Sequence, residues 1–550
     1  MNTDVDTARR TDGLVGLQKY GMLLMGVFLV ILSGGRFVTP SAAFLAPVFL
    51  LRYTRNTTLK TGMAVLYVFL FLSLLVRLHD YLDVERPLNL LPVAGIAILE
   101  LIPFIADRTL REYLPTFLRP LVLPTVFVLL GFVFSAVMPF GSMGEKAYTQ
   151  VGNSELMQLL AVTGTHGVTF VILWFAATMA SLWDSGFVWQ RNRSQVMPLM
   201  LCLMIIFVAG GFRTIFDENE SPTVRIAGVV ADQKSLRQSL REAGVASGNS
   251  YGLSVAGFDR DSVDVSLAAN LQNLLSHTNK LADAGASIVA WAESSAVLFK
   301  SSEAQFDATA SEVAMRNSIY LVAAVNIVAD PVDEKQEPVE NKLVIFGPNG
   351  DKLGQYIKAK ALWNENIVEG NGKPLVIDTP HGMLAFTIGF DIDFPALIRQ
   401  AGDADLIIAP SYDWRTLTPH HSLMATFRGV ENGLSVFRPT QRGMSLASDS
   451  HGRILAQTDH FRSDTESFIA DVPTAGVDTF YTRAGDWFVY LTVCIFLLLL
   501  VMVFLSARKR KNSDPPGGPA DPDEVRDRSR ITAIQWREAE RDNNLHRNNK

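Results

Sequence analysis

The sequence predicts a polytopic α-helical membrane bundle of about eight spans that carries a layered, extracytoplasmic α/β domain. Apolar runs of about 20 residues, the length that crosses a bilayer core, recur up to residue 213 and once more near the C-terminus. Between these runs, residues 216–485 alternate short apolar strand patterns with amphipathic helix patterns, which is typical of layered α/β packing. Basic residues gather mainly on one side of the apolar runs, and this bias sets orientation.

The apolar runs define candidate spans, which lie at residues 18–34, 36–52, 61–78, 87–106, 117–138, 156–182, 195–213 and 486–507. The first two are short and closely spaced, so one of them could be re-entrant. The predicted parts are therefore a bundle of about seven spans (1–215), the α/β domain (216–485), a C-terminal transmembrane helix (486–511) and a disordered cytoplasmic tail (512–550). A run rich in proline and glycine at 514–519 marks the start of this tail.

The basic residues predict the orientation. Arg52, Arg55, Arg191, Arg193 and the run at 508–511 all fall on one side when the amino terminus is cytoplasmic. With eight spans, both termini are then cytoplasmic and residues 216–485 face outward. The first span has no small-residue cleavage site and is followed by further spans, so it is not interpreted as a removable signal peptide.

Composition excludes some functions. The 550 residues carry a net charge of −6, and the sequence pI is about 5.9, so no nucleic-acid partner is expected. Only two cysteines are present, Cys202 and Cys494, and both lie in apolar runs. Buried apolar cysteines are usually inert, so neither is expected to supply a thiol to residues 216–485.

Two ionisable residues lie within predicted spans, Glu100 and His166. Such groups are functional candidates by default. The plainer interpretation is that Glu100 reaches toward Arg108 near the inner face, while His166 satisfies a helix contact. No paired broken helices or internal repeats are evident, which weakens a transporter interpretation.

Within 216–485, strand patterns occupy 224–230, 287–290, 319–328, 343–346, 374–377, 384–388, 406–409, 435–438, 444–447 and 454–456. Helix patterns occupy 262–284 and 303–317, and a further helix ends at Gly433. A proline-asparagine-glycine sequence at 348–350 predicts a hairpin turn.

Three segments at strand ends carry residue types suited to acyl transfer. Glu293 follows a buried strand, Lys358 follows Tyr356, and an apolar strand leads to Gly389 and then to Asp391. A carboxylate within hydrogen-bond reach can take a proton from a nucleophile. A fixed cation can stabilise a tetrahedral oxyanion in a dry pocket.

With these motifs, the segment from about 216 to 485 resembles the nitrilase (carbon–nitrogen hydrolase) superfamily, whose domains are α-β-β-α sandwiches. The layout of residues 15–510 resembles bacterial apolipoprotein N-acyltransferases, which are inner-membrane proteins. Supporting motifs in the expected order occupy 428–433, 438–443 and 480–487. In that family a cysteine thiolate takes an acyl chain from a phospholipid and passes it to the amino terminus of a lipoprotein. The resemblance implies no cofactor and no metal.

Residue roles follow from the resemblance. Glu293 matches the general base and Lys358 the oxyanion-stabilising cation, but Gly389 stands at the nucleophile position. Asp391 stands where the family has glutamate. The loop after the lysine also departs from the family pattern.

Four residues are predicted to bind substrate; they are Glu365, Asp391, Trp363 and Tyr412. A replacement nucleophile would have to come from Thr387, Ser411 or Tyr412. Alternatively, Glu293 and Lys358 are simply a retained buried ion pair.

Two functional interpretations remain open. The chain could be a homologue without the thioester step that binds phospholipid or lipoprotein amino termini, or that partners an active paralogue. Alternatively, it could be an active N-acyltransferase with an altered, non-cysteine mechanism. In both cases the membrane is the expected environment.

Overall fold

The structure, a computed structural model, describes residues 18–35, 37–79, 90–216, 221–243, 259–329, 339–362, 365–462 and 467–513. Among the described residues, those from 18 to 497 belong to one compact unit that contains both the helix bundle and the α/β domain, and residues 498–513 belong to a second. Trp363 and residues 514–550 of the predicted tail lie outside the described residues.

The membrane part consists mainly of helices. These are Gln18–Ile31, α2 (Pro40–Arg55), α3 (Leu59–Arg77), α4 (Leu90–Leu110), α5 (Val122–Val137), α6 (Ser154–Met157), α7 (Leu160–Asp184), α8 (Trp189–Phe216) and α15 (Trp487–Ser513). Short 3-10 turns are η1 (Arg111–Tyr113), η2 (Thr116–Leu121) and η3 (Lys146–Gln150), and the strands β1 (Ser33–Gly34) and β2 (Phe37–Val38) form a small hairpin before α2.

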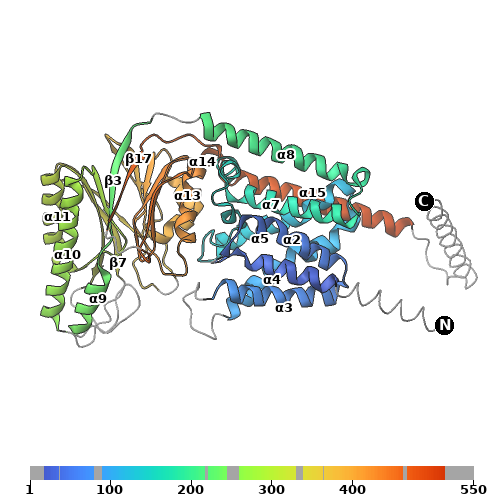
Figure 1. Ribbon diagram of the computed structural model, residues 1–550, viewed down its shortest axis with the longest axis horizontal. Helices are drawn as coiled ribbons and strands as arrows, with labels where there is room; N and C mark the ends of the chain where they lie inside the picture. The colour runs from blue at the N-terminus through green and yellow to red at the C-terminus, as the bar shows by residue number, and fades with distance from the viewer. Residues whose placement is uncertain are drawn as a thin grey trace, which may run out of the picture. The chain divides into compact units, whose positions relative to one another are not determined.

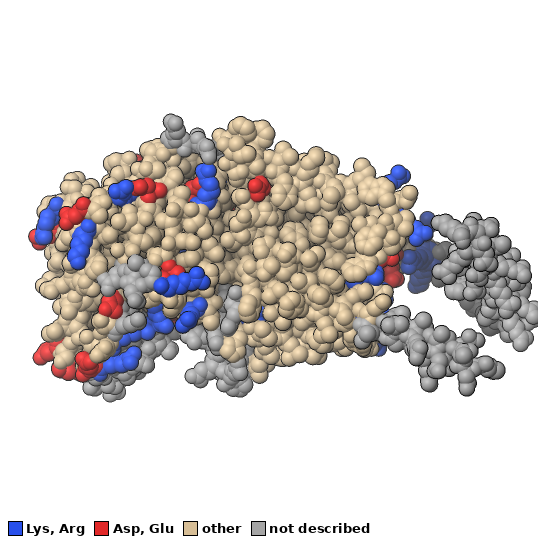
Figure 2. Space-filling view, viewed as in Figure 1, with Lys and Arg blue, Asp and Glu red and all other residues tan. Residues whose placement is uncertain are grey.

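Every predicted span coincides with a helix, and among the described residues six helices are long and apolar enough to cross a membrane. The helix Gln18–Ile31 and the 16-residue α2 are shorter, so their crossing of the bilayer stays a prediction. In the face shown in Figure 2, charged side chains gather over the α/β domain, whereas the surface of the bundle beside it is almost uncharged. Such an apolar surface is expected to face lipid.

Ion pairs join the ends of three bundle helices. Arg55 pairs with Asp107 at 2.8 Å and with Asp184 at 2.9 Å, and Arg52 also pairs with Asp184. The ends of α2, α4 and α7 therefore meet at one end of the bundle, where several of the predicted basic flanking residues lie. The side of the membrane that this end faces stays a prediction.

Glu100 has a different ion-pair partner from the one expected. Its carboxylate pairs with Arg77 of α3 at 2.7 Å, whereas Arg108 pairs with Glu112 at 3.2 Å. The expected pairing with Arg108 is wrong, because eight residues along a helix span roughly 12 Å, while α3 packs directly against α4. His166 places Nδ1 at 3.7 Å from Glu145 and meets the ring of Phe132 edge-on.

Helix α7 is broken at Gly164, a feature that the sequence analysis did not expect. Gly164 has φ 63° and ψ −169°, and a Cβ atom there would lie 2.6 Å from a ring carbon of Tyr481. The next amide, on Thr165, donates a hydrogen bond to Glu431 of the α/β domain at 3.1 Å. A carboxylate therefore caps the second half of the helix, where the helix dipole favours negative charge.

The α/β domain contains two packed sheets. The first has the strand order β17-β3-β4-β6-β7-β8, with β5 beside β6, and the second has the order β16-β15-β13-β11-β10-β9. The bounds are β3 (Thr223–Val229), β4 (Ile288–Trp291), β5 (Ala296–Phe299), β6 (Tyr320–Val328), β7 (Glu340–Phe346), β8 (Lys352–Ile357), β9 (Leu375–Thr379), β10 (Gly382–Phe386), β11 (Leu406–Ile408), β12 (Ser411–Tyr412), β13 (Ser435–Arg438), β14 (Thr440–Gln441), β15 (Met444–Ser448), β16 (Ile454–Asp459) and β17 (Ser467–Pro473).

Helices cover both outer faces of the sandwich, as Figure 1 shows. On the first sheet lie α10 and α11, with α9 against α10, whereas α13 lies on the second sheet and also contacts α7 of the bundle. The helices and turns of the domain are α9 (Gln233–Glu242), α10 (Arg260–Asp283), η4 (Lys300–Ser302), α11 (Glu303–Asn317), η5 (Gly389–Asp393), α12 (Pro395–Ile398), η6 (Arg399–Ala401), α13 (His420–Asn432) and α14 (Phe480–Ala484). The layers are α-β-β-α, as predicted.

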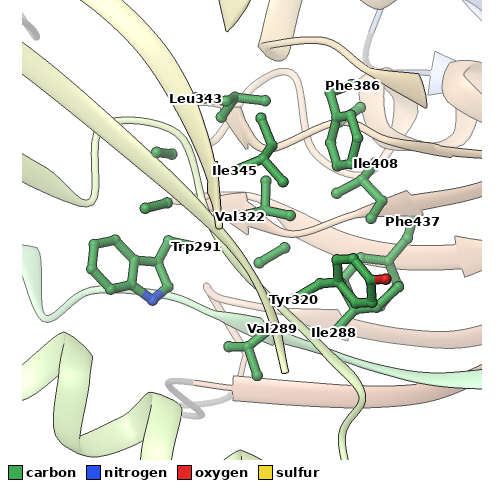
Figure 3. Close-up of a cluster of buried hydrophobic side chains, with 14 of the residues drawn as sticks. Ile288, Val289, Trp291, Tyr320, Val322, Leu343, Ile345, Phe386, Ile408 and Phe437 are labelled. Atoms are coloured by element: carbon green, nitrogen blue, oxygen red, sulfur yellow. The ribbon is translucent and has the colours of Figure 1, made fainter. Parts of the chain in front are cut away.

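The core lies between the two sheets. Figure 3 shows Val322 and Ile345 of the first sheet facing Phe386, Ile408 and Phe437 of the second. All five are at most 1% exposed. Each such side chain contributes roughly 1.5–3 kcal/mol through burial, so this interface fixes how the two sheets lie on each other.

The sheet topology brings the predicted site residues to one edge. Strands β3, β4 and β6 are parallel to one another, and β10, β11 and β13 are parallel in the second sheet. Glu293 follows β4, and Gly389 follows β10. The carboxyl ends of parallel strands share an edge, and there α/β sheets usually place their sites.

Candidate active site

Gly389 lies at a sharp turn between β10 and the 3-10 helix η5. Its φ of +47° is in the left-handed region that glycine adopts without strain. Its amide donates a 2.7 Å hydrogen bond to the carbonyl oxygen of Pro410, after β11. Together these features place residue 389 at the carboxyl edge of the second sheet, facing the first.

The carboxylate of Glu293 fills the space beside Gly389. A Cβ atom at residue 389 would lie 2.2 Å from Oε2 of Glu293 and 2.9 Å from its Cδ. Real Cβ atoms do not approach other atoms so closely. The carboxylate therefore occupies the volume into which a side chain at position 389 would project.

An ion cluster holds this carboxylate in place. Lys358 Nζ lies 2.9 Å from Glu293 Oε1 and 2.8 Å from Glu365 Oε1. Asn341 also donates a hydrogen bond to Glu293 Oε1 at 2.8 Å. The three charged side chains are at most 1% exposed, so the cluster is removed from water.

Burial and charge set the protonation of the cluster. Burial raises the pKa of Glu293, and the negative charge of Glu365 adds to this effect, while Lys358 and Asn341 oppose it. Burial disfavours the ammonium of Lys358, but the two carboxylates outweigh it and raise the pKa of Lys358. Two acids face one cation, so a proton on Glu293 makes the cluster electrically neutral.

Asp391 joins the lysine segment to the turn. It accepts hydrogen bonds from the Tyr356 hydroxyl at 2.6 Å and from the amides of Lys360 and Ala359 at 2.7 and 3.2 Å. Burial raises its pKa to about 6 against these hydrogen bonds. Both carboxylate oxygens are thus occupied by partners from the chain itself, which fixes the loop after Lys358 beside Gly389.

The other two predicted substrate-binding residues that the structure describes, Glu365 and Tyr412, lie in separate groups. Glu365 belongs to the ion cluster, and its second oxygen accepts from the amide of Leu362 at 2.9 Å. The hydroxyl of Tyr412 accepts hydrogen bonds from Arg237 at 2.5 Å and from Arg442 at 3.0 Å. The structure therefore brings Glu293, Lys358 and Glu365 together at Gly389, and it places Tyr412 in a separate group.

Two of the three expected replacement nucleophiles, Thr387 and Ser411, make no hydrogen bond to a base among the described residues. Thr387 is fully buried, and its hydroxyl has no hydrogen-bond partner among the described residues. Ser411 donates to the carbonyl oxygen of Ala409 at 2.9 Å. A hydroxyl needs an adjacent base to become a useful nucleophile, and neither of these two hydroxyls bonds to a carboxylate or an imidazole.

The sequence analysis missed a second buried network at the other end of η5. His421 lies between Asp393, at 2.6 Å from Nε2, and Asp413, at 2.7 Å from Nδ1. Arg438 makes two hydrogen bonds to Asp413, at 3.0 and 3.1 Å. Burial disfavours a charged His421, but the two carboxylates outweigh it and raise its pKa to about 9. Only Arg438 had a sequence signal, as part of the motif at 438–443.

The turn also touches the membrane bundle. The amide and the hydroxyl of Ser142 both donate to the carbonyl oxygen of Asp393, at 2.9 and 2.7 Å. A cavity of about 180 Å³ lies in the bundle beside this contact, and its lining includes Arg77, Glu100 and Lys146. Neither Glu293 nor Gly389 is among the residues that line this cavity.

Comparison with known proteins agrees with this architecture. Residues 253–480 match the carbon-nitrogen hydrolase family, and residues 26–178 match the N-terminal domain of apolipoprotein N-acyltransferase. An apolipoprotein N-acyltransferase of Geobacter metallireducens is 23% identical over 395 residues, which cover 66% of this chain and 70% of that protein. The chain is an apolipoprotein N-acyltransferase-like protein of the nitrilase superfamily.

Other relatives of this N-acyltransferase-like chain match over shorter stretches. Apolipoprotein N-acyltransferase 2 of Treponema denticola is 31% identical over 133 residues, which are 23% of this chain and 24% of that protein. Among solved structures, an amidase from Nesterenkonia sp. covers 50% of this chain and 97% of its own, with 16% identity and a TM-score of 0.37. No group of three or more metal-ligating side chains occurs among the described residues of this N-acyltransferase-like protein.

Proposed function

We propose that this protein is an inner-membrane homologue of the apolipoprotein N-acyltransferases that binds phospholipid or lipoprotein amino termini without forming a thioester. One observation carries the proposal. The carboxylate of Glu293 occupies the space that a side chain at position 389 would need. We assign Gly389 to the nucleophile position of the family, Glu293 to the base and Lys358 to the cation.

The chemistry supports a binding role. A thioester needs a cysteine, and residues 216–485 contain none. Lys358 is already engaged by two carboxylates, so its charge is not free to stabilise an oxyanion. Enzymes that lose their nucleophile retain only roughly 10³–10⁴-fold catalysis over water. Direct attack of an amine on a phospholipid ester would therefore be slow here.

The membrane setting is part of the proposal. Six apolar helices and the likeness to apolipoprotein N-acyltransferases support a multi-pass protein of the bacterial inner membrane. The bias of basic residues supports cytoplasmic termini and a domain that faces outward. An active paralogue that retains the cysteine would be a natural partner for a homologue that only binds.

An altered mechanism is the second candidate function, and Thr387 is the observation that favours it. Its buried hydroxyl has no hydrogen-bond partner in the part of the chain that the structure describes, and leaving such a group unsatisfied costs roughly 1–3 kcal/mol. A hydroxyl retained at that cost two residues before Gly389 could serve as a nucleophile after a local rearrangement that supplies a base.

An acyl-transfer assay separates the two candidates. The full chain in nanodiscs is mixed with phosphatidylethanolamine and a diacylglyceryl peptide, and both N-acylation and peptide binding are measured. We expect binding without turnover above a protein-free control. Turnover abolished by Glu293→Gln would defeat the binding proposal, and turnover also abolished by Thr387→Val would identify the altered mechanism.

Restoring a thiol tests the assignment of position 389. In Gly389→Cys, the new side chain must displace the Glu293 carboxylate, which is the flexible end of its side chain. We expect an acyl-phospholipid probe to label residue 389 slowly but specifically. Gly389→Ala is the control and should remain unlabelled. Absence of labelling would show that residue 389 does not stand at an acyl-accepting position.

A further inference from the structure

Two arginines without carboxylate partners meet at one tyrosine of the α/β domain. Arg237 of α9 and Arg442, in the turn after β14, both donate to the hydroxyl of Tyr412, at 2.5 and 3.0 Å. The two guanidinium groups therefore lie within two hydrogen bonds of each other. Arginine stays protonated in proteins, so both groups carry a positive charge.

This arrangement differs from that of five other arginines in the domain. Arg225, Arg399, Arg428, Arg438 and Arg453 each form an ion pair with a carboxylate. Within the described ranges, no carboxylate lies within ion-pair distance of Arg237 or Arg442. Like charges held close together repel one another, and an anion between them would remove the repulsion.

Arg442 has a strained backbone conformation. Arg442 has φ +52°, a region that residues other than glycine rarely adopt and that is costly for them. The next residue, Gly443, allows a tight turn, because a Cβ atom there would lie 2.6 Å from Thr440 Cγ2. Backbone strain of this kind is concentrated at functional sites.

The two arginines are also held relative to each other. The side-chain amide of Gln441, next to Arg442, makes two hydrogen bonds to the backbone of Ala231, at 3.1 and 2.8 Å. Ala231 follows β3 and precedes α9, and Asp232 caps the first turn of α9 through the amide of Ser235 at 3.2 Å. The turn that carries Arg442 and the helix that carries Arg237 are therefore both anchored to the segment that begins at Ala231.

This arginine pair lies at the same sheet edge as Gly389. Tyr412 follows β11, which pairs directly with β10, the strand that leads to Gly389. Adjacent strands are separated by only ~4.8 Å. Nevertheless, the pair shares no residue with the cluster of Glu293, Lys358 and Glu365.

We propose that Arg237 and Arg442 bind the phosphate group of a ligand at the edge of the sheet, with Tyr412 aligning them. Two guanidinium groups can each make paired, charge-assisted hydrogen bonds to phosphate oxygens. Such a group occurs in a phospholipid headgroup and in a soluble phosphate ester. The proposal goes beyond the function proposed above, since it uses none of the residues at Gly389.

Binding to the full chain in detergent tests the proposal by titration calorimetry with three probes: inorganic phosphate, glycerol 3-phosphate and short-chain phosphatidic acid. We expect Arg237→Gln or Arg442→Gln to weaken binding at least about tenfold, and the double variant to abolish it. Tyr412→Phe should weaken it less. Arg225→Gln, at the far end of β3, is the matched control and should bind as the wild type does.

The probes also identify the source of the phosphate. Phosphatidic acid bound at least about tenfold more tightly than glycerol 3-phosphate supports a lipid headgroup, and equal affinities support a soluble ester. Absence of binding by all three probes at millimolar concentration would overturn the proposal. So would equal affinities of the wild type and a folded double variant, with folding checked by its melting temperature. Neither result depends on the acyl-transfer assay.

Discussion

Two buried charge clusters lie at the two ends of the turn that begins at Gly389, and pKa values shift in them for different reasons. At the start of η5, Glu293 and Glu365 face the single cation Lys358, and burial raises the pKa of Glu293. At its end, His421 takes up a proton between two aspartates, and its pKa rises to about 9. Burial favours the neutral form of an acid in the first cluster, whereas two carboxylates favour the charged form of a base in the second.

This difference indicates separate roles for the two clusters. The His421 network has a partner for both of its ring nitrogens, and its Asp393 also binds Ser142 of the bundle. It therefore stabilises the contact between the domain and the membrane part. We assign the Lys358 cluster to the position where the family performs chemistry, and there the Glu293 carboxylate fills the space that a side chain at residue 389 would need. We therefore interpret the His421 network as structural, and the Lys358 cluster as a site that its own residues fill.

Removal of the shared cation should have the largest effect. Lys358→Met leaves two buried carboxylates without their counter-charge, and breaking a buried pair in this way costs about 3–5 kcal/mol. The free energy of unfolding in detergent measures this loss. Arg225→Gln, which removes an exposed pair, should change it by less than about 1 kcal/mol. A loss below about 1 kcal/mol for Lys358→Met would show that the cluster is open to water.

The His421 network predicts a pH dependence of stability. In the folded protein the pKa of His421 is about 9, above its ordinary value of 6.5. Its contribution to the free energy of unfolding is therefore complete below pH 6.5 and is lost as pH rises to about 9. At about 1.4 kcal/mol for each pKa unit, this loss is about 3 kcal/mol.

Comparison of the wild type with His421→Gln above pH 7 isolates this effect. Burial raises the pKa of Asp391 to about 6 and that of Glu431 to about 7, so Asp391 is largely titrated in this range, while Glu431 still titrates in both proteins. The melting temperature of the wild type should therefore fall between pH 7 and 9, and that of His421→Gln should fall less. Parallel curves for the two proteins would contradict the assignment of a charged His421.

Substitution of the glycine should have an intermediate effect. Gly389→Ala places a side chain at a positive φ and against the Glu293 carboxylate, for which we expect a cost of about 1–3 kcal/mol in unfolding free energy. In the background of Glu293→Asp, whose side chain is one methylene shorter, the same substitution should cost less. A double-mutant cycle measures the coupling. Additive costs would show that the carboxylate does not occupy this space.

Neutralisation of Glu293 should have the smallest effect. Since burial raises its pKa above the ordinary 4.5, the folded protein resists loss of this proton, and wild-type stability falls as pH rises through that range. Glu293→Gln removes this dependence and should change stability by no more than about 1 kcal/mol at neutral pH. A large loss for Glu293→Gln would show instead that the charged form of Glu293 is needed.

Much of this architecture was predictable from sequence, because hydrophobic periodicity and strand ends are local signals. Helix α11 has the predicted bounds of 303–317, α13 ends at Asn432 directly before the predicted stop at Gly433, and Glu293 and Lys358 lie together at strand ends. The break at Gly164 could not be predicted, since it depends on Tyr481 and Glu431, which lie more than 250 residues further along the chain.

The same limit applies to the site. A sequence shows that residue 389 has no side chain, but it does not show that Glu293 fills the space. The convergence of Arg237 and Arg442 on Tyr412 likewise depends on helix α9, the turn after β14 and strand β12 meeting in space. The short strand β5 and the edge strand β17 were also missed. Strand β5 has too few residues to show a clear alternation of apolar and polar side chains. Strand β17 pairs with β3, which lies at the opposite end of the domain sequence.

Intact-protein mass spectrometry gives the most direct test of the closed site. The wild-type chain is incubated with phosphatidylethanolamine and with an activated acyl donor, treated or not treated with hydroxylamine, and residues 216–485 are mapped by proteolysis. We predict an unmodified mass in this segment under every condition. A fatty acyl adduct there that hydroxylamine removes would show covalent acyl transfer and would contradict the account.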